Sequence, residues 1–391
     1  MTVPADSRAA APVRGRVVGV DVARALALVG MFSVHILPVL TARGTETAAG
    51  AIAAGRSAAL FAVLAGVGIA LGTGGPRPPP DGREHRTAAV GLLVRGLLVA
   101  AIGLWLVRLD PPVAVILAYY GLLFVVAAPL LRLPPAVLAT GAVLCCGLAP
   151  VLSHLLRSGL PEGPGEQPGF DALSEPADLL LTLGLTGYYP VLPWATYLLA
   201  GLAVGRLDLH RLRTTVALLV GGAALATGAA VISALLLGPG GGAAAITAAS
   251  GTSALGRERY GTVPTGTWWW LAVDEAHSGT PLDLAHTTGT ALAVLGAALL
   301  LARWAPRAVW PLAALGSIPL TLYTLHVIAV TVHPGSGPDD AAVFVWHVGV
   351  ALLLGVALRL AGRRGPLEWV ASRVGGAARR AAGETAHPLH R

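Results

Sequence analysis

Residues 19–35 read GVDVARALALVGMFSVH, an apolar stretch of membrane-spanning length that contains three ionisable side chains. At 3.6 residues per turn, Asp21, Arg24 and His35 lie on one face of a helix, with apolar residues filling the stripe between them. A charge at the centre of a bilayer costs about 2.5–3.5 kcal/mol on insertion scales, so such residues usually face a polar interior and mark function. The stretch therefore predicts a first transmembrane helix and a candidate site on that helix.

The composition places the whole chain in a membrane. Of its 391 residues, 55% are hydrophobic and only 12% are charged, and the mean hydropathy is +0.71. A soluble domain carries about 25% charged residues. Ten apolar segments have membrane-spanning length: 18–40, 57–74, 88–107, 113–131, 136–156, 186–205, 214–237, 287–303, 310–332 and 341–361. The sequence predicts an all-α, polytopic integral membrane helix bundle with about ten transmembrane helices.

The placement of the arginines predicts the orientation of this bundle. All 27 basic residues are Arg, and most of them fall in every second connection and at the two ends of the chain. The positive-inside rule then puts both termini in the cytoplasm. The net charge of +7 is explained by topology and by contact with lipid headgroups, so we expect membrane lipid and no nucleic acid as a partner.

Three parts are expected along the chain. Residues 1–16 are predicted to be a disordered cytoplasmic N-terminus, 17–362 a single transmembrane domain, and 363–391 a basic cytoplasmic tail that lies along the inner leaflet or is unstructured. Two long loops, 157–185 and 238–286, are predicted outside the cell, and loops of this length are commonly functional or disordered. No repeat relates the two halves, which disfavours a transporter built from inverted repeats.

Four side chains are predicted in the outer half of the membrane. His35 is a candidate base near neutral pH, or a histidine that only hydrogen-bonds a neighbouring helix. Arg56 opens the second span from outside, where it could hold a carboxylate or polar group of a substrate, or reach the outer headgroups. Tyr323 and His326 are three residues apart on one face of the ninth span. His326 could meet His35, or serve only as an interhelical contact.

The second outer loop and the third span supply further candidates. His277, Asp283 and His286 could form part of a pocket for an acceptor molecule. Their spacing matches no recognised zinc motif, so no metal is expected. Arg95 lies within the third span and is a candidate for an inner polar cavity.

At the inner end of the bundle, three residues are candidates for binding a donor molecule. Asp21 and Arg24 would lie near the cytoplasmic leaflet, where they could shape a donor site or form only an interfacial ion pair. Arg206, at the inner end of the sixth span, could contact donor phosphates or could only orient the protein in the membrane.

Several motifs, in their order along the chain, resemble known membrane acyltransferases. Asp21, Arg24 and His35 are spaced as in the first helix of the acyltransferase type 3 family, in which that histidine is thought to be catalytic. The remainder resembles bacterial membrane proteins that carry the heparan-alpha-glucosaminide N-acetyltransferase catalytic domain, over most of residues 14–360. The matching stretches are 55–61, 119–123, 189–194 through 205–206, 277–280, and 315–323.

This resemblance implies transfer of an acyl group, commonly acetyl, from cytoplasmic acyl-CoA to an extracytoplasmic acceptor, often an amino sugar or a sugar hydroxyl. It implies acetyl-CoA as donor and no tightly bound cofactor. The animal enzyme's active histidine belongs in the loop after the first helix, and residues 41–55 here contain no histidine. His35, or a loop histidine such as His277, would have to replace it.

We therefore expect a multi-pass acyltransferase of the plasma membrane. His35 would act as base or transient acyl carrier, Asp21 and Arg24 would shape the donor side, and Arg56, Tyr323 and His326 would position the acceptor. A small-molecule or lipid exporter would use the same residues as a pathway, and a non-catalytic membrane subunit would need none of them. The concentration of polar residues around one outer site favours the enzyme.

Overall fold

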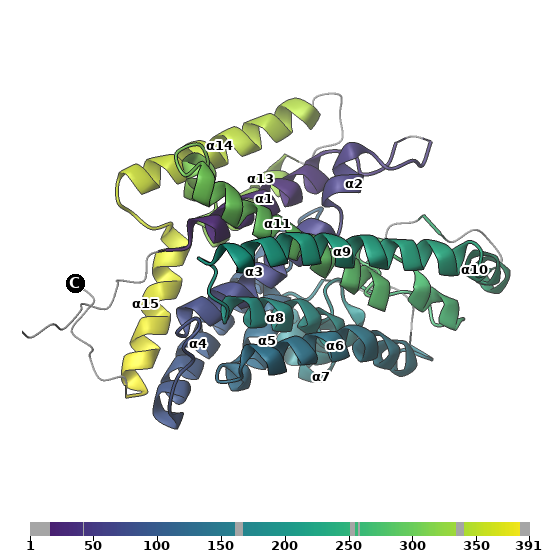
Figure 1. Ribbon diagram of the computed structural model, residues 1–391, viewed down its shortest axis with the longest axis horizontal. Helices are drawn as coiled ribbons and strands as arrows, with labels where there is room; N and C mark the ends of the chain where they lie inside the picture. Colours follow the sequence, from purple (N-terminus) through teal and green to yellow (C-terminus); the bar gives the residue numbers. More distant parts are fainter. Residues whose placement is uncertain are drawn as a thin grey trace, which may run out of the picture.

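Figure 1 shows the computed structural model, which describes residues 16–41, 43–160, 167–250, 255–256, 259–333 and 340–383. Within these ranges the chain forms helices and their connections, with a single isolated bridge between Leu40 and Glu46. The predicted all-α, polytopic bundle is confirmed.

Seven helical segments are long and apolar enough to cross a membrane. They are α1 (Val18–Ile36), α2 (Ala48–Ala53) together with α3 (Arg56–Gly72), α4 (Gly82–Val107), α6 (Pro135–Leu156), α9 (Leu212–Leu237), α11 (Pro281–Trp304) and α14 (Asp340–Leu360). The other three predicted spans contain shorter apolar helices: α5 (Leu117–Ala127), α8 (Val191–Gly205) and α13 (Pro319–Val332). Every predicted span thus coincides with an apolar helix.

Four short or peripheral helices complete the fold. They are α7 (Pro176–Leu181), α10 (Gly242–Ser250), α12 (Trp310–Leu315) and α15 (Pro366–Ala381). Figure 1 shows α15 lying across the end of the bundle beside α4, whereas α6 and α9 run along its length. Part of the predicted tail is therefore an ordered helix. Residues 1–15 of the predicted disordered segment and 384–391 of the tail lie outside the described residues.

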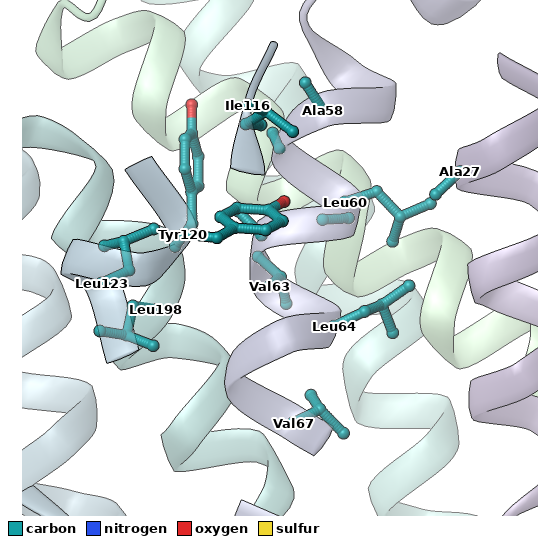
Figure 2. Packing of buried hydrophobic residues seen from close by; sticks show 14 of the residues in the cluster. Ala27, Ala58, Leu60, Val63, Leu64, Val67, Ile116, Tyr120, Leu123 and Leu198 are labelled. Atoms are coloured by element: carbon teal, nitrogen blue, oxygen red, sulfur yellow. The ribbon is translucent and has the colours of Figure 1, made fainter. Parts of the chain in front are cut away.

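The core surrounds α1, which packs against α3, α11, α12, α13 and α14. After its first residues, helix α3 is apolar on all sides, which is typical of a helix buried among other helices. Figure 2 shows Leu60, Leu64 and Val67 of this helix among their neighbours from α1 and α8. Glycine lets α3 and α8 approach at backbone distance: a Cβ on Gly66 would lie 2.5 Å from the carbonyl oxygen of Leu198. This packing holds α1 and α3, which carry Asp21, Arg24, His35 and Arg56, in a fixed relation.

Candidate functional site

A cavity of about 660 Å³ opens where α1 ends, under the loops that follow α10. Its wall carries polar and aromatic side chains from segments far apart in the sequence: His35, Arg56, Tyr188, Tyr189, Asp274 and His277. Concave sites with a few convergent polar groups are the usual places for small-molecule binding. We call this space the outer cavity.

His35 and His326 meet at this cavity, as the sequence suggested they could. His35 Nδ1 lies 3.0 Å from His326 Nε2, and the two rings stack with centroids 5.2 Å apart. His326 is buried and also stacks on Phe32, one turn before His35 on α1, at 4.2 Å. Tyr323, one turn before His326, accepts a hydrogen bond from the backbone N–H of Ile116 at 3.2 Å and lines a small extension of the cavity beside His35.

Arg56 is held by His286 of α11 and, through it, by Asp274 of the loop that precedes α11. Its Nε donates to His286 Nε2 at 3.3 Å, and His286 Nδ1 lies 2.7 Å from Asp274 Oδ2. Because a guanidinium only donates, His286 Nε2 must accept and its Nδ1–H must donate to the carboxylate. Gly55, with φ of +68°, starts α3 where a Cβ would touch Ala276 and so lets Arg56 approach this loop.

His286 was predicted from the sequence to share a pocket with His277 and Asp283, whereas Asp274 was not selected as a site residue. Both lie in the same stretch as His277, so their residue types were visible. The contact of His286 with Arg56 joins positions 230 residues apart, which no local spacing reveals.

His277 and Asp283 occupy different positions relative to the outer cavity. His277 lies in the wall with a backbone φ of +59°, and burial lowers its pKa to about 4, so its ring is neutral near pH 7. Asp283 is buried behind the wall, where it accepts a hydrogen bond from the backbone N–H of Gly279 at 2.9 Å. Thr280 caps the start of α11 by accepting from the N–H of Asp283 at 3.1 Å. Asp283 thus supports the loop that carries His277.

A second cavity, also of about 660 Å³, lies at the opposite end of α1. We call it the inner cavity. Asp21 is buried there and accepts from Arg16 Nε and, at 3.2 Å, from Arg24 Nη1. Gly68 of α3 leaves room for the second guanidinium, because a Cβ at that position would lie 2.7 Å from Arg24 Nη2. The cavity therefore presents two guanidinium groups held by one carboxylate.

Arg95 and Arg206 do not line the inner cavity. Arg95 lies on α4 beside α15, where a Cβ on Gly375 would lie 2.7 Å from Arg95 Cγ. Arg206 is buried, and its Nη1 donates to the carbonyl oxygens of Ala70 at 2.9 Å and Gly75 at 3.0 Å. These carbonyls lie at and just beyond the end of α3, where helix geometry leaves carbonyl oxygens with spare accepting capacity. The guanidinium of Arg206 thus closes the end of α3.

The two cavities share no lining residue. Along α1, Leu28 and Met31 lie between them and are buried, as is Leu64 of the adjoining α3. The helix rises about 16 Å from Arg24 to His35. Apolar side chains therefore separate the two polar sites within one rigid element.

The model of the family described as heparan-alpha-glucosaminide N-acetyltransferase, catalytic, matches residues 16–235, more than half of the chain. The resemblance noted in the sequence is confirmed by this match. It covers α1 to nearly all of α9, including His35, Arg56 and the inner cavity's Asp21 and Arg24. No curated protein matches the chain.

Proposed function

The chain belongs to the heparan-alpha-glucosaminide N-acetyltransferase catalytic family, and we propose that it transfers an acetyl group from cytoplasmic acetyl-CoA to an acceptor on the other side of the membrane. The family and the apolar helices indicate a membrane protein with an acetyltransferase-like function. The plasma membrane is the proposed location, and a sugar or amino sugar is the proposed acceptor.

One observation carries the proposal: α1 joins two polar cavities, one at each of its ends. In the inner cavity, the guanidinium groups of Arg16 and Arg24 suit the phosphates of a CoA donor, and Asp21 orients both of them. Arg95 would add positive charge nearby. Arg206, whose Nη1 and Nη2 both donate to groups at the end of α3 and to its neighbours, is proposed to support this region structurally rather than to bind the donor.

The outer cavity supplies groups suited to acyl transfer. His326 engages Nδ1 of His35, which leaves Nε2 of His35 to act on a substrate. As base, this nitrogen takes the proton when the acceptor N–H or O–H breaks and the new bond to the acyl carbon forms; the C–S bond breaks and the thiolate of CoA takes up the proton. As carrier, it first attacks the acyl carbon, the C–S bond breaks and the CoA thiolate leaves; the acceptor then attacks the acyl-imidazole, the bond from the acyl carbon to nitrogen breaks, and the proton of the acceptor goes to the thiolate.

Other residues of the outer cavity suit the acceptor and the transition state. Arg56, fixed through His286 and Asp274, is placed to stabilise the oxyanion that develops on the acyl group or to bind a polar group of the acceptor. The faces of Tyr188 and Tyr189 offer apolar contact area for a sugar ring. Tyr323 lines the small extension beside His35, and His326 contacts His35 from behind the wall.

Acetyl transfer by the purified protein tests this function. The full chain is reconstituted in nanodiscs with ¹⁴C-acetyl-CoA and a glucosaminide, and labelled product is measured for wild type, His35→Ala and the control His333→Ala at the exposed end of α13. We expect His35→Ala to lose about 10²–10⁴-fold in rate while membrane insertion is unchanged. Transfer by His35→Ala at the wild-type rate would refute the role of His35.

A pair of cavities at opposite ends of one helix also fits an exporter that opens each side in turn. Sealed proteoliposomes separate the two functions. An exporter moves substrate without acetylated product and without acyl-CoA, whereas the proposed enzyme yields acetylated product only when acyl-CoA is present on the inner-cavity side.

A further inference from the structure

A third histidine, His347 on α14, extends the pair of His35 and His326 away from the outer cavity. Its ring stands edge-on to that of His326, with centroids 5.3 Å apart, and Phe32 contacts both rings. His326 Nδ1 and His347 Nε2 are buried and have no hydrogen-bond partner among the described residues. An unsatisfied buried polar atom costs about 1–3 kcal/mol in free energy of folding. Two such atoms on neighbouring rings therefore call for one explanation that covers both rings.

The backbone of α14 fixes the proton position at the far end of this chain of rings. His347 Nδ1 lies 3.0 Å from the carbonyl oxygen of Val343. Because a carbonyl oxygen only accepts, Nδ1 of His347 carries the proton, and Nε2 of the neutral ring is an acceptor. His326 Nδ1 forms no direct hydrogen bond with this acceptor, so a proton carried by His326 Nδ1 would be donated to it through one bridging water.

The same constraint then passes to His35. When Nδ1 of His326 carries the proton, its Nε2 holds a lone pair and must accept from His35 Nδ1 across the 3.0 Å contact. His35 Nε2 is then unprotonated. In the opposite tautomer, Nε2 of His35 would carry the proton and could serve neither as base nor as nucleophile.

We propose that His347 is a positioning residue that, through His326, holds His35 in the tautomer with an unprotonated Nε2. The chain of rings runs from the carbonyl of Val343 to the outer cavity, and each ring donates through Nδ1 and accepts through Nε2. His347 lies outside residues 16–235, so the part of the chain beyond the family match completes the site. The catalytic role of the unprotonated His35 Nε2 rests on the proposed function. The tautomer of His35 does not depend on that function.

Nitrogen NMR tests the tautomer directly. The protein is labelled with ¹⁵N-histidine in nanodiscs, and the ring signals of His35, one of 11 histidines, are identified by their absence in His35→Asn. Wild type is expected to show a protonated Nδ1 and an unprotonated Nε2 at His35. In His347→Phe, which keeps the ring and removes both nitrogens, a mixture of tautomers is expected. The amide oxygen of His347→Gln can replace the acceptor and is expected to restore the single tautomer.

Kinetics provide the second measurement. His347→Phe is expected to lower kcat about 10²-fold, with unchanged KM for acetyl-CoA and for the acceptor. His347→Gln is expected to recover most of kcat. The control His333→Phe, at an exposed position, is expected to match wild type. A wild-type His35 protonated on Nε2, or an unaltered tautomer in His347→Phe, would overturn the proposal even if transfer is observed. The expected tautomers in a protein that transfers no acyl group would uphold it and refute the proposed function.

Discussion

Arg56 and His286 are predicted to act as one unit, and a double-mutant cycle measures their coupling. Arg56→Met removes every donor of the guanidinium, and His286→Phe removes both ring nitrogens while keeping the ring. Asp274 contacts Arg56 through His286 in the observed geometry. If His286 acts only by holding Arg56, replacing it has no effect once Arg56 is absent.

The geometry sets the size of this coupling. A hydrogen bond to a charged group contributes about 1.5–3 kcal/mol, and the 3.3 Å separation between Arg56 Nε and His286 Nε2 is long for such a bond. The lower value, about 1.5 kcal/mol, corresponds to a loss of roughly 12-fold in kcat/KM for His286→Phe. Arg56→Met also removes the donors that face the cavity, and a loss of about 10²–10³-fold is expected for it.

The assay is acetyl transfer in nanodiscs with acceptor below its KM, so that the initial rate reports kcat/KM. The double variant is expected to match Arg56→Met, which gives a coupling energy of about 1.5 kcal/mol. A further 12-fold loss in the double variant would mean that His286 acts on the substrate by itself, and the reasoning from the Arg56–His286–Asp274 contacts would be wrong.

Three further predictions concern the inner cavity, the loop and the end of the bundle. Asp21→Asn releases the two guanidinium groups that Asp21 holds. The KM for acetyl-CoA should therefore rise about tenfold, which corresponds to about 1.4 kcal/mol, with the KM for the acceptor unchanged. Equal changes in both KM values would contradict a role on the donor side. Burial lowers the pKa of His277 to about 4, so the unfolded chain binds more protons between about pH 6.5 and 4. The unfolding temperature should therefore fall as pH decreases through that window, and less steeply in His277→Asn; parallel curves would contradict this. Glu368→Ala removes the acceptor of the backbone N–H groups of Leu320 and Thr321 at the start of α13 and should cost about 1 kcal/mol, seen as a lower unfolding temperature that Glu368→Gln largely restores.

The positions of the helices could be predicted because the bilayer imposes a length and an apolar composition on each span. All ten predicted segments contain an apolar helix, but α5, α8 and α13 are shorter than their segments. The segment 310–332 is divided between α12, which ends at Leu315, and α13, which starts with Pro319; Gly316 in the break lies against α1, where a Cβ would collide with the backbone of Asp21. Hydropathy does not register such a break, because the residues on both sides of it are apolar.

The candidate site was predictable where one helix carried its residues, and less so where contacts cross the fold. Helical periodicity alone placed Asp21 and Arg24 on the stripe of α1 that leads to His35. The contact of His35 with His326 joins positions 291 residues apart, and that of Arg56 with His286 joins positions 230 apart. His347 was not considered, because the sequence shows it only as a single histidine in an apolar span. Its proposed role depends on its contact with His326, which the structure reveals.

The proposed transfer also requires the acyl group to cross the apolar segment of α1 between the two cavities. Phosphates bound at Arg24 would lie about 16 Å along α1 from His35, and buried Leu28 and Met31 occupy that interval. Met31 lines the small extension of the outer cavity beside His35, and an unbranched thioether side chain changes rotamer at little cost. A thin, flexible acyl arm could therefore displace this side chain, whereas a rigid sugar could not follow it. The same constriction would admit the acyl group to His35 and keep donor phosphates and acceptor on their own sides of the membrane.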